Sequence, residues 1–363
     1  MKAKLTVLIT GCGSPAAPGV IQSLRSVKAH DFSIIGVDMD ADNAGRGLVD
    51  LFFKGPKADD PDFIHTLLNL ARAHQVDCIL PLVTKEVPAF AKHREAFNRI
   101  GTAVSVSDEK PLAYALNKGR LFHFLKDKGF RVPDFHVART PSELKSALAD
   151  LGYPKRAVCF KPTESDGSRG FRVLDQTKDR FDLLFHAKPT SVYMDEKDLY
   201  HLLKGRNKIP ETVVMEYLPN EEYSVDLLMD RGKHLIAIPR LRQRVESGIS
   251  VRSKIVKEDD VIDYAVEIAE TLGLNGNIGI QIRRDDNGIP KILEINPRIQ
   301  GTIVHCTAAG VNLPYLAVKL ALGLPIQQEE LKVHWGLSMV RYWKEVFFDE
   351  KGQPIDFQRN EST

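Results

Sequence analysis

Residues 281–298 read QIRRDDNGIPKILEINPR, and this stretch decides how the second half of the chain folds. Two apolar runs flank the Asn-Gly pair at 287–288, which is the strongest short signal for a β-hairpin. A two-residue loop there would place Gln281 opposite Glu294, and strand alternation would place Asn296 on the same face as Glu294. The sequence therefore predicts one sheet face that carries a carboxylate and two amides.

This predicted face would offer ligands for a metal ion. Oxygen donors suit Mg²⁺, which usually takes one or two protein carboxylates together with the phosphates of a substrate. Arg298 follows Asn296 by two residues and can hold a phosphate through two hydrogen bonds. The alternative is the polar outer face of a surface hairpin, which would be the better interpretation of a solitary glutamate. We favour the metal site because three oxygen donors fall on one face beside an arginine.

Composition and charge narrow the class of protein. The chain has 363 residues, of which 43% are hydrophobic and 27% charged, and its net charge is +2. These values are ordinary for a globular protein and do not suggest general nucleic-acid binding, which normally needs a clustered basic excess. No run of 18 apolar residues occurs, so no membrane-spanning helix is expected. The 4 cysteines match no zinc or redox spacing, which favours buried thiols in a cytoplasmic compartment.

Residues 1–107 alternate apolar strands with amphipathic helices. The expected strands are LTVLIT (5–10), FSIIGVD (32–38) and DCILPLV (77–83), and the expected helices are PGVIQSLRSV (18–27) and DFIHTLLNLARAH (62–74). Such alternation predicts a Rossmann-like parallel sheet with right-handed crossovers. The loop GCGSPAAPG (11–19) is a weak match to a dinucleotide fingerprint, because Pro15 and two alanines interrupt it and Asp38 lies too far along the chain. A tight turn that feeds a helix explains this loop equally well.

From residue 108 the pattern changes to α+β. Asn117 can cap a helix whose apolar residues share one face. A strand then ends in Lys161 and a polar, glycine-containing loop follows at 163–171. The charged segment 175–210 is interpreted as a flap with some helix. Later strands are expected at 212–218 and 223–230, and an amphipathic helix at 259–273. The predicted domains are 1–107, 108–210 and 211–363.

Two lysines stand at positions that suit phosphate binding. Lys118 opens the helix that Asn117 caps, and Lys161 immediately precedes the glycine loop. Gly167 and Gly170 would let backbone N–H groups approach phosphate oxygens, with Lys161 as a point charge beside them. An exposed surface lysine is the alternative for each residue. The chain has no P-loop, HExxH, GxSxG or kinase motif.

The order of these elements resembles the ATP-grasp superfamily, and specifically its branch that is similar to the carbamoyl phosphate synthase large subunit. The resemblance covers residue 1 to about residue 325 and rests on the motifs NKGRLFHFLKDKGFRVP (117–133), FKPTESDGSRG (160–170), VVMEYLPNEEYSVD (213–226) and QIRRDDNGIPKILEINPRIQGT (281–302). It implies an α/β and α+β fold, in which a Rossmann-like pre-ATP-grasp domain precedes a two-subdomain ATP-grasp fold. This chain has one ATP-grasp unit where the synthetase has two, which puts full carbamoyl phosphate synthesis in doubt.

The resemblance also assigns roles to residues. Lys118 and Lys161 would hold the nucleotide phosphates under the loop of Ser165, Gly167, Ser168 and Gly170. Glu216, Tyr217 and Leu218 would form the adenine hinge, and Glu222 would accept the ribose hydroxyls. Gln281, Glu294 and Asn296 would bind two Mg²⁺ ions, a site that Mn²⁺ also suits, and Arg298 would face the transferred phosphoryl group.

Arg240, Arg242 and Arg244 alternate along one expected strand. Three like charges on one strand face repel each other, and an anion would relieve the repulsion. One hypothesis is that Arg240 and Arg242 in particular contact a phosphate or a substrate carboxylate. The alternative is a solvated sheet edge.

The family mechanism implies an ATP-dependent carboxylate–amine ligase that activates its acid as an acyl phosphate. Its partners would be a small carboxylate and an amine, with no nucleic acid or membrane, and a homodimer is an open question. One alternative is a carbamoyl-phosphate-synthase-like enzyme that phosphorylates bicarbonate or carbamate. Others are a non-catalytic, ATP-binding regulatory protein and, less favoured, a dehydrogenase.

Overall fold

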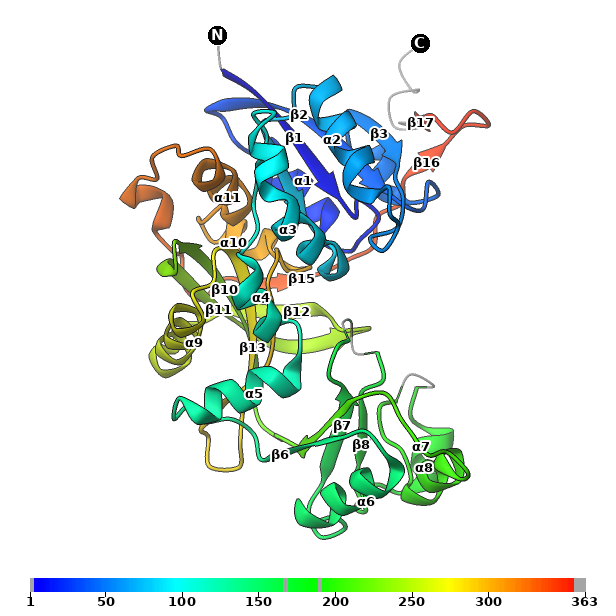
Figure 1. Cartoon of the computed structure of the whole chain (residues 1–363). Coiled ribbons are helices and arrows are strands. Elements are labelled where there is room, and N and C mark those ends of the chain that lie inside the picture. Colours follow the sequence, from blue (N-terminus) through cyan, green and yellow to red (C-terminus); the bar gives the residue numbers. More distant parts are fainter. Residues whose placement is uncertain (1–2, 166, 168, 189–190, 356–363) are drawn as a thin grey trace. The chain divides into compact units, whose positions relative to one another are not determined.

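A computed structural model describes residues 3–165, 167, 169–188 and 191–355 (Figure 1). The chain forms two compact units, and both are discontinuous in sequence. The first consists of 1–112, 223–280 and 295–363, and the second of 113–222 and 281–294. The expected boundaries were contiguous blocks, whereas here the hairpin segment 281–294 joins a unit whose other residues come much earlier.

The N-terminal part of the first unit is a parallel sheet in the order β3-β2-β1-β4-β5. Its strands are β1 (Ala3–Thr10), β2 (His30–Asp38), β3 (Leu51–Lys54), β4 (Cys78–Pro81) and β5 (Ala103–Val104). Its helices are α1 (Ala17–Arg25), α2 (Phe63–Ala73) and α3 (Val87–Asn98), with short 3-10 turns η1 (Ala44–Gly47) and η2 (Thr84–Glu86). This confirms the expected Rossmann-like domain and adds β3 and β5.

The loop after β1 is held by bonds within the protein. The Gly13 N–H donates to Asp38 Oδ2 at 2.7 Å, and the Ser14 N–H donates to the Gly11 carbonyl at 2.8 Å. The Ala17 N–H in turn donates to the Ser14 carbonyl. Because these amides already have partners, they are not arranged to cradle a pyrophosphate. The loop is a tight turn that starts α1, which argues against the dinucleotide alternative.

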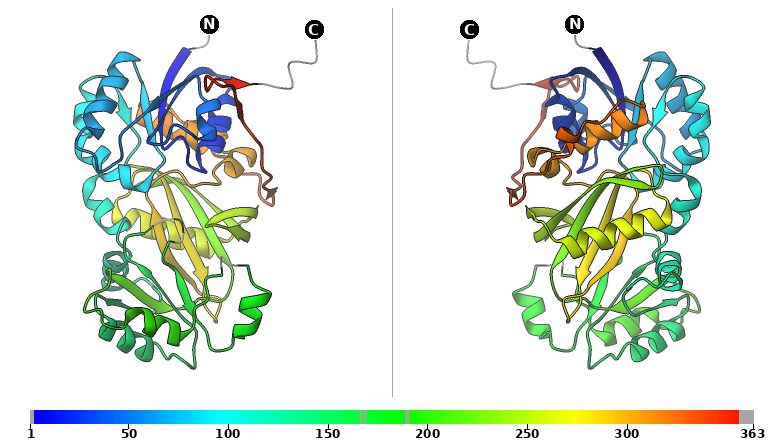
Figure 2. Two further views of the ribbon diagram at one scale, coloured as in Figure 1. Left: turned by 90° about the vertical axis from the view of Figure 1, so that its right-hand side faces the viewer. Right: turned by 90° about the vertical axis from the view of Figure 1, so that its left-hand side faces the viewer.

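The first unit also contains most of a six-stranded sheet in the order β14-β13-β10-β11-β12-β15. These strands are β10 (Glu222–Asp230), β11 (Lys233–Glu246), β12 (Ile249–Ile255), β13 (Gly276–Arg284), β14 (Pro290–Asn296) and β15 (Ser338–Val340). Helix α9 (Asp259–Leu272) lies along one face of this sheet (Figure 2). It starts with two acidic residues, which suit the helix dipole, and stops at Gly273 in the left-handed conformation, with φ of 72°.

Further helices complete the first unit. They are α10 (Val304–Ala308), α11 (Leu313–Ala321) and the 3-10 turn η3 (Gln328–Leu331), and α4 (Glu109–Ala115) runs across the boundary at residue 112. Helix α1 contacts both α10 and α11, so one hydrophobic core joins the N-terminal sheet to the segment after β14. Near the C-terminus, β16 (Phe347–Phe348) pairs with β17 (Pro354–Ile355).

The second unit is built on a four-stranded antiparallel sheet in the order β6-β9-β7-β8. Its strands are β6 (Phe135–Ala138), β7 (Val158–Pro162), β8 (Arg172–Leu174) and β9 (Thr212–Glu216), and its helices are α5 (Lys118–Asp127), α6 (Pro141–Asp150), α7 (Arg180–Phe185) and α8 (Glu196–Leu203). Helix α6 opens with a capping box between Thr140 and Glu143 and packs on β6 and β9. The segment 175–210 contains α7 and α8.

The hairpin at 281–298 forms, but its loop is one residue longer than expected. The Asp285 N–H donates to the Ile289 carbonyl, and the Gly288 N–H donates to the Asp285 carbonyl. Residues 286–288 therefore form a three-residue loop, with Gly288 in the left-handed region at φ of 76°. The Asp285 carboxylate stabilises the loop by accepting from the Asn287 and Ile289 N–H groups. The predicted two-residue loop, which paired Asp286 with Ile289, is wrong.

Two expectations from composition can be compared with the structure. The 4 cysteines are all buried and free, as expected from their spacing. In the described part of the chain, no helix is long and apolar enough to cross a membrane.

Candidate nucleotide and metal site

Two lysines from distant parts of the second unit meet at one carboxylate. Lys118 Nζ lies 3.5 Å and Lys161 Nζ 3.3 Å from Oε2 of Glu294. Lys161 Nζ also donates to the Leu293 carbonyl, and Lys118 Nζ donates to the Ser165 carbonyl. Both lysines are buried, at 4% and 9% exposure, so neither is the exposed surface lysine that was the alternative. The predicted phosphate lysines and the predicted metal carboxylate therefore form one cluster.

Local structure explains how each lysine reaches this cluster. Lys161 lies on β7, opposite Val213 of the neighbouring strand β9, which fixes its direction. Lys118 is the first residue of α5, and its N–H donates to the Thr163 carbonyl at the start of the glycine loop. Asn117 caps the helix as predicted, because its side chain accepts from the Arg120 N–H.

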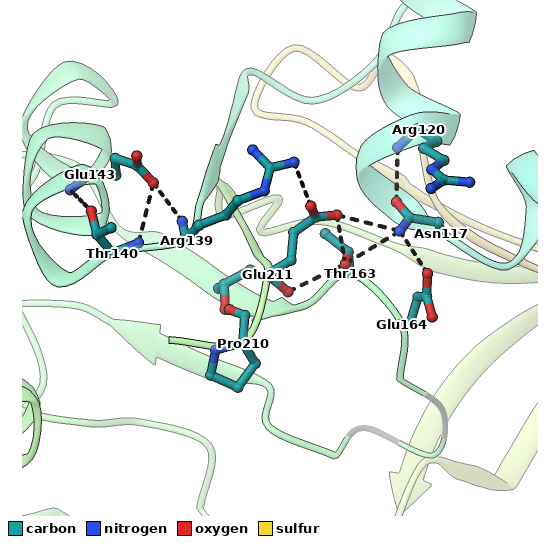
Figure 3. Close-up of polar contacts among 10 residues, drawn as sticks. Asn117, Arg120, Arg139, Thr140, Glu143, Thr163, Glu164, Pro210 and Glu211 are labelled. Atoms are coloured by element: carbon teal, nitrogen blue, oxygen red, sulfur yellow. Dashed lines mark hydrogen bonds and ion pairs between the residues drawn. The ribbon is translucent and has the colours of Figure 1, made fainter. Parts of the chain in front are cut away.

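Asn117 also belongs to a polar network that sequence reasoning missed (Figure 3). Its amide donates to Glu164 at 2.9 Å and lies 3.4 Å from Oε1 of Glu211. Glu211 accepts from the Thr163 hydroxyl and from Arg139 as well. Burial acts to raise the pKa of Glu211, but the hydrogen bonds from Asn117, Arg139 and Thr163 outweigh it and lower this pKa. The network ties the start of α5 to the start of the glycine loop.

The glycine loop follows directly from this network. The Ser165 hydroxyl donates to the Pro162 carbonyl, and Gly167 and Gly170 both adopt positive φ, at 57° and 73°. A Cβ on Gly170 would lie 2.7 Å from Cδ of Pro162, so only glycine fits there without a shift. Ser168, which was predicted to contact phosphate, lies outside the described residues.

The predicted adenine hinge is held by a lysine of the hairpin. Lys291 Nζ lies 2.6 Å from Oε1 of Glu216 and 3.3 Å from Oδ2 of Asp285. Burial opposes the charge of Lys291, but these two carboxylates outweigh it and raise the pKa of the ammonium. The Glu216 carboxylate also accepts from the Asp134 N–H. The Glu216 carboxylate therefore already has partners within the protein. Tyr217 and Leu218 directly follow the end of β9.

Glu222 lies at the start of β10 and faces the hairpin. Arg283 Nη1 is 4.0 Å from Oε2 of Glu222, and the Arg283 guanidinium stacks over the ring of Tyr217 at 5.0 Å. Arg283 was not predicted as a site residue. Its alternation with Gln281 along β13 was a usable signal, because residues two apart share a strand face.

The predicted metal ligands are divided between the two units. Gln281 and Glu294 belong to the second unit, whereas Asn296 and Arg298 belong to the first. Among the described residues, no three His, Cys, Asp or Glu side chains cluster as metal ligands. The predicted set instead contains one carboxylate and two amides. Its donors are all oxygens, which fit Mg²⁺.

Arg298 is held firmly within the first unit. Its Nε donates to the Thr84 hydroxyl at 3.0 Å, its Nη1 to the Ile299 carbonyl and its Nη2 to Oδ1 of Asn296. Thr84 belongs to η2 of the N-terminal sheet, and it was not predicted as a site residue. These contacts fix the guanidinium beside one of the predicted metal ligands.

The three alternating arginines have different surroundings. Arg240 is only 1% exposed and its Nε lies 2.5 Å from Oδ2 of the buried Asp226. Arg242 donates to Ser250 and to the Gly248 carbonyl, and exposed Arg244 pairs with Glu246. A register shift between Arg242 and Arg244 interrupts the regular pairing of β11 with β12. The expectation of three charges that repel on one face is therefore wrong, and Arg240 acts as a core ion pair.

Comparisons with known proteins identify two domains in the chain. Residues 208–344 match the family described as ATP-grasp in the biosynthetic pathway with Ter operon, and residues 7–118 match the PylC-like N-terminal domain. The chain is 23% identical over 296 residues to the carbamoyl phosphate synthase large chain of Pseudothermotoga lettingae, a match that covers 78% of this chain and 24% of that one. The chain spans about a quarter of the length of such curated relatives.

Two solved structures illustrate the fold that this chain shares. An ADP complex of purK, the N5-carboxyaminoimidazole ribonucleotide synthetase, superposes with a TM-score of 0.68 at 16% identity, over 94% of this chain and 82% of that one. An L-amino acid ligase from Bacillus licheniformis gives a TM-score of 0.63 at 17% identity, over 92% and 78%. At such identities the likeness shows the fold alone.

The fold and the matched domains define the class: this chain carries an ATP-grasp domain over residues 208–344. More particularly, it joins one ATP-grasp unit to a PylC-like N-terminal domain and is related in sequence to carbamoyl phosphate synthase large chains.

Proposed function

We propose that this protein is an ATP-dependent ligase that activates a carboxylate as an acyl phosphate for attack by an amine. The observation that carries the proposal is the convergence of buried Lys118 and Lys161 on Glu294. Two buried ammonium groups that lie against one carboxylate suit a ligand that carries several negative charges. Such a site favours a polyphosphate over neutral ligands. The L-amino acid ligase that shares this fold supports the same class of reaction.

The nucleotide would be held by residues of the second unit. Lys118 and Lys161 would contact its phosphates, and the backbone of the loop 163–170 would approach them as a cover. The hinge of Glu216, Tyr217 and Leu218 would read the adenine edge through backbone groups, because Lys291 already binds the Glu216 carboxylate. Glu222 would accept from the ribose. The purK structure, which is an ADP complex, supports ATP as the nucleotide.

Gln281, Glu294 and Asn296 would hold one or two Mg²⁺ ions, and Mn²⁺ fits the same oxygen donors. When bound, the metal supplies positive charge at the phosphoryl oxygens. The protein's part is to position the lysines and Arg298, since phosphoryl transfer depends mainly on placement and charge. Arg298 is suited to this because Thr84 and Asn296 already orient its guanidinium.

The acyl phosphate would stay bound in the site without a covalent bond to the enzyme. Ser253 Oγ does lie 2.9 Å from Nδ1 of His305, which resembles a nucleophile beside a base. Both residues are fully buried, however, at 0% and 1% exposure. Burial, followed by the nearby Arg240 charge, lowers the pKa of His305 to about 4. We interpret this pair as part of the core.

The direct test is to trap the acyl phosphate. ADP release is screened over small carboxylates with Mg-ATP and hydroxylamine, and a hydroxamate should form only when ATP and the correct acid are both present. A screen in which no acid yields a hydroxamate would contradict the ligase proposal.

A second function is favoured by the sequence relatives, which are carbamoyl phosphate synthase large chains. This chain would then phosphorylate bicarbonate or carbamate. ATP cleavage that needs bicarbonate and no organic acid would support this alternative. A non-catalytic regulatory protein is less well supported, because Gln281, Glu294 and Asn296 are all present.

We further propose small-molecule substrates and a cytoplasmic setting, which the four free, buried thiols support. A homodimer is part of the same proposal and is tested by light scattering across a concentration series.

A further inference from the structure

Arg341, in the first unit, has a buried N–H donor without a hydrogen-bond partner among the residues that the structure describes. Arg341 follows β15, and its N–H extends the pairing with β12 by donating to the Val251 carbonyl. Its Nη2 donates to the Gly301 carbonyl at 3.0 Å and lies 3.5 Å from the Thr302 hydroxyl. Its Nε is buried and has no hydrogen-bond partner. A guanidinium has five N–H donors, so within the described residues most of those of Arg341 remain available.

The charge of Arg341 is also not balanced nearby. In the described part of the chain it makes no salt bridge. The buried carboxylate of Asp226 is already paired with Arg240. Burial, and then the positive charge of Arg240, lower the pKa of Arg341. Burial lowers the pKa of His305 to about 4, so this residue is neutral at pH 7 and adds no further positive charge. The segment therefore keeps a partly desolvated cation without a matching anion.

An unneutralised, partly buried cation with an unpaired donor is costly, and folded proteins usually avoid both. Such costs persist where function needs them. Gly301, whose carbonyl accepts from Arg341, lies three residues after Arg298, the predicted catalytic cation. The space beside Gly301 is also open: a Cβ added there would meet nothing within 4 Å. An anion that entered beside Gly301 would therefore find the unused N–H groups of Arg341.

We propose that Arg341 binds the carboxylate of the acid substrate, holding it at the turn 298–302. This inference rests on the proposed ligase function for the identity of the anion. A guanidinium matches a carboxylate through two parallel N–H···O bonds, which fixes orientation as well as charge. Binding would satisfy the Nε donor and neutralise the cation in one step. Arg298 would then remain for the phosphoryl group, so the two arginines would divide the recognition of the two substrates.

The test separates a ligand-binding arginine from a structural one. Arg341→Met removes the charge, and Arg252→Met is the matched control, because Arg252 is exposed on β12 and pairs with Val340, next to Arg341. Thermal unfolding is measured for each variant and for the wild type in chloride, and then in acetate and in bicarbonate at the same ionic strength. Acetate and bicarbonate serve as the probes for a small carboxylate.

In chloride, Arg341→Met should unfold at the same temperature as the wild type or higher, because it loses an unneutralised charge. Acetate or bicarbonate should stabilise the wild type and Arg252→Met, but not Arg341→Met, with apparent anion affinity at least about tenfold weaker. An Arg341→Met variant that melts well below the wild type, yet keeps the anion response, would show a structural role and overturn the inference.

A second measurement distinguishes this inference from the proposed function. In the hydroxamate assay, Arg341→Lys should raise the KM for the acid while the KM for ATP stays unchanged, because Lys keeps the charge but not the two-point contact. If no acid supports turnover but Arg341→Met still abolishes the anion response, the arginine site stands and the ligase proposal falls. If turnover is normal in Arg341→Met, the ligase proposal stands and the arginine site falls.

Discussion

Lys118 and Lys161 both approach the same oxygen of Glu294, at 3.5 and 3.3 Å. The carboxylate thereby offsets the repulsion between two buried ammonium groups in the free protein. When a divalent cation takes the carboxylate, the lysines lose this partner, and another anion can replace it. Nucleotide phosphates supply it, so metal and nucleotide should bind with positive cooperativity.

The first prediction concerns Glu294. Glu294→Ala should reduce ADP release on the order of a thousandfold, because it removes the only charged ligand of the predicted metal set. Circular dichroism should be unchanged. Asp286→Ala, which removes an exposed acid from the same hairpin, should keep normal turnover. Near-normal ADP release by Glu294→Ala would contradict the metal role.

The second prediction is that Asn117 contributes to nucleotide affinity as well as to the free energy of unfolding. Asn117→Ala removes the cap of α5 and the bonds to Glu164 and Glu211, and the cap alone should cost about 1 kcal/mol. Asn312→Ala is the matched control, because Asn312 caps α11 in the other unit. Both variants should lose similar stability in urea, but only Asn117→Ala should bind a fluorescent ATP analogue more weakly. Equal nucleotide affinity in the two variants would rule out a positioning role.

Gly170 offers a test of the glycine loop. Gly170→Ala must accommodate both a positive φ of 73° and a Cβ that meets Pro162, so the loop should shift. ATP affinity should fall by about tenfold, roughly 1.4 kcal/mol. Gly129 has a similar φ of 83° but open space around its Cβ, so Gly129→Ala should cost only the backbone strain of about 1 to 2 kcal/mol. Its ATP affinity should be normal, and a loss as large as that of Gly170→Ala would refute the loop interpretation.

The fourth prediction is a pH dependence at Glu86. Burial raises the pKa of this carboxyl group to about 7, although the Thr10 hydroxyl donates to it. Between the unfolded pKa of about 4.5 and the folded value, the native state holds a proton that the unfolded chain has lost. Stability should therefore fall as pH rises from about 4.5 to 7, by roughly 2 to 3 kcal/mol.

Glu86→Gln mimics the protonated form. It should be more stable than the wild type at pH 8, and equal to it at pH 4.5, in urea unfolding at each pH. A difference that does not change with pH would show that the carboxyl group titrates normally.

The fifth prediction separates Arg240 from its neighbours on β11. Arg240→Met leaves Asp226 buried and unpaired, which should cost about 3 to 5 kcal/mol of unfolding free energy. Arg244→Met alters an exposed pair and should change stability by less than about 0.5 kcal/mol. Similar stability of the two variants in urea would contradict the core ion pair.

Much of the fold could be predicted from periodicity. The strand and helix alternation before residue 107 gave the correct parallel sheet, and Asn117 marked the start of α5. Strand β3 was missed because Leu51 and Phe52 stand in a short run without clear alternation. The hairpin loop was misjudged by one residue because an Asn-Gly pair serves both two- and three-residue turns, and the choice depended on the Asp285 side chain.

The candidate site was harder to predict wherever it depends on distant contacts. Lys118, Lys161 and Glu294 were chosen from motif order, and the structure brings them together. No local pattern could show that Asp226 neutralises Arg240, since that pairing arises from the register of β10 against β11. Lys291 and Glu211 were missed for a similar reason, because their partners Glu216 and Asn117 lie far away in sequence.

The discontinuity of the second unit has a consequence for how the protein is made. Lys161 and Glu294 are separated by 133 positions in the sequence. During synthesis, Lys161 therefore leaves the ribosome long before Glu294 does. Until the hairpin 281–294 emerges, the carboxylate of Glu294 is not there for Lys118 and Lys161. The second unit also lacks the parts of β13 and β14 that belong to it. Contacts of such long range slow folding and leave early segments exposed. A nascent chain that stops before residue 281 should therefore remain protease-sensitive through residues 113–222 and need a chaperone until synthesis passes the hairpin.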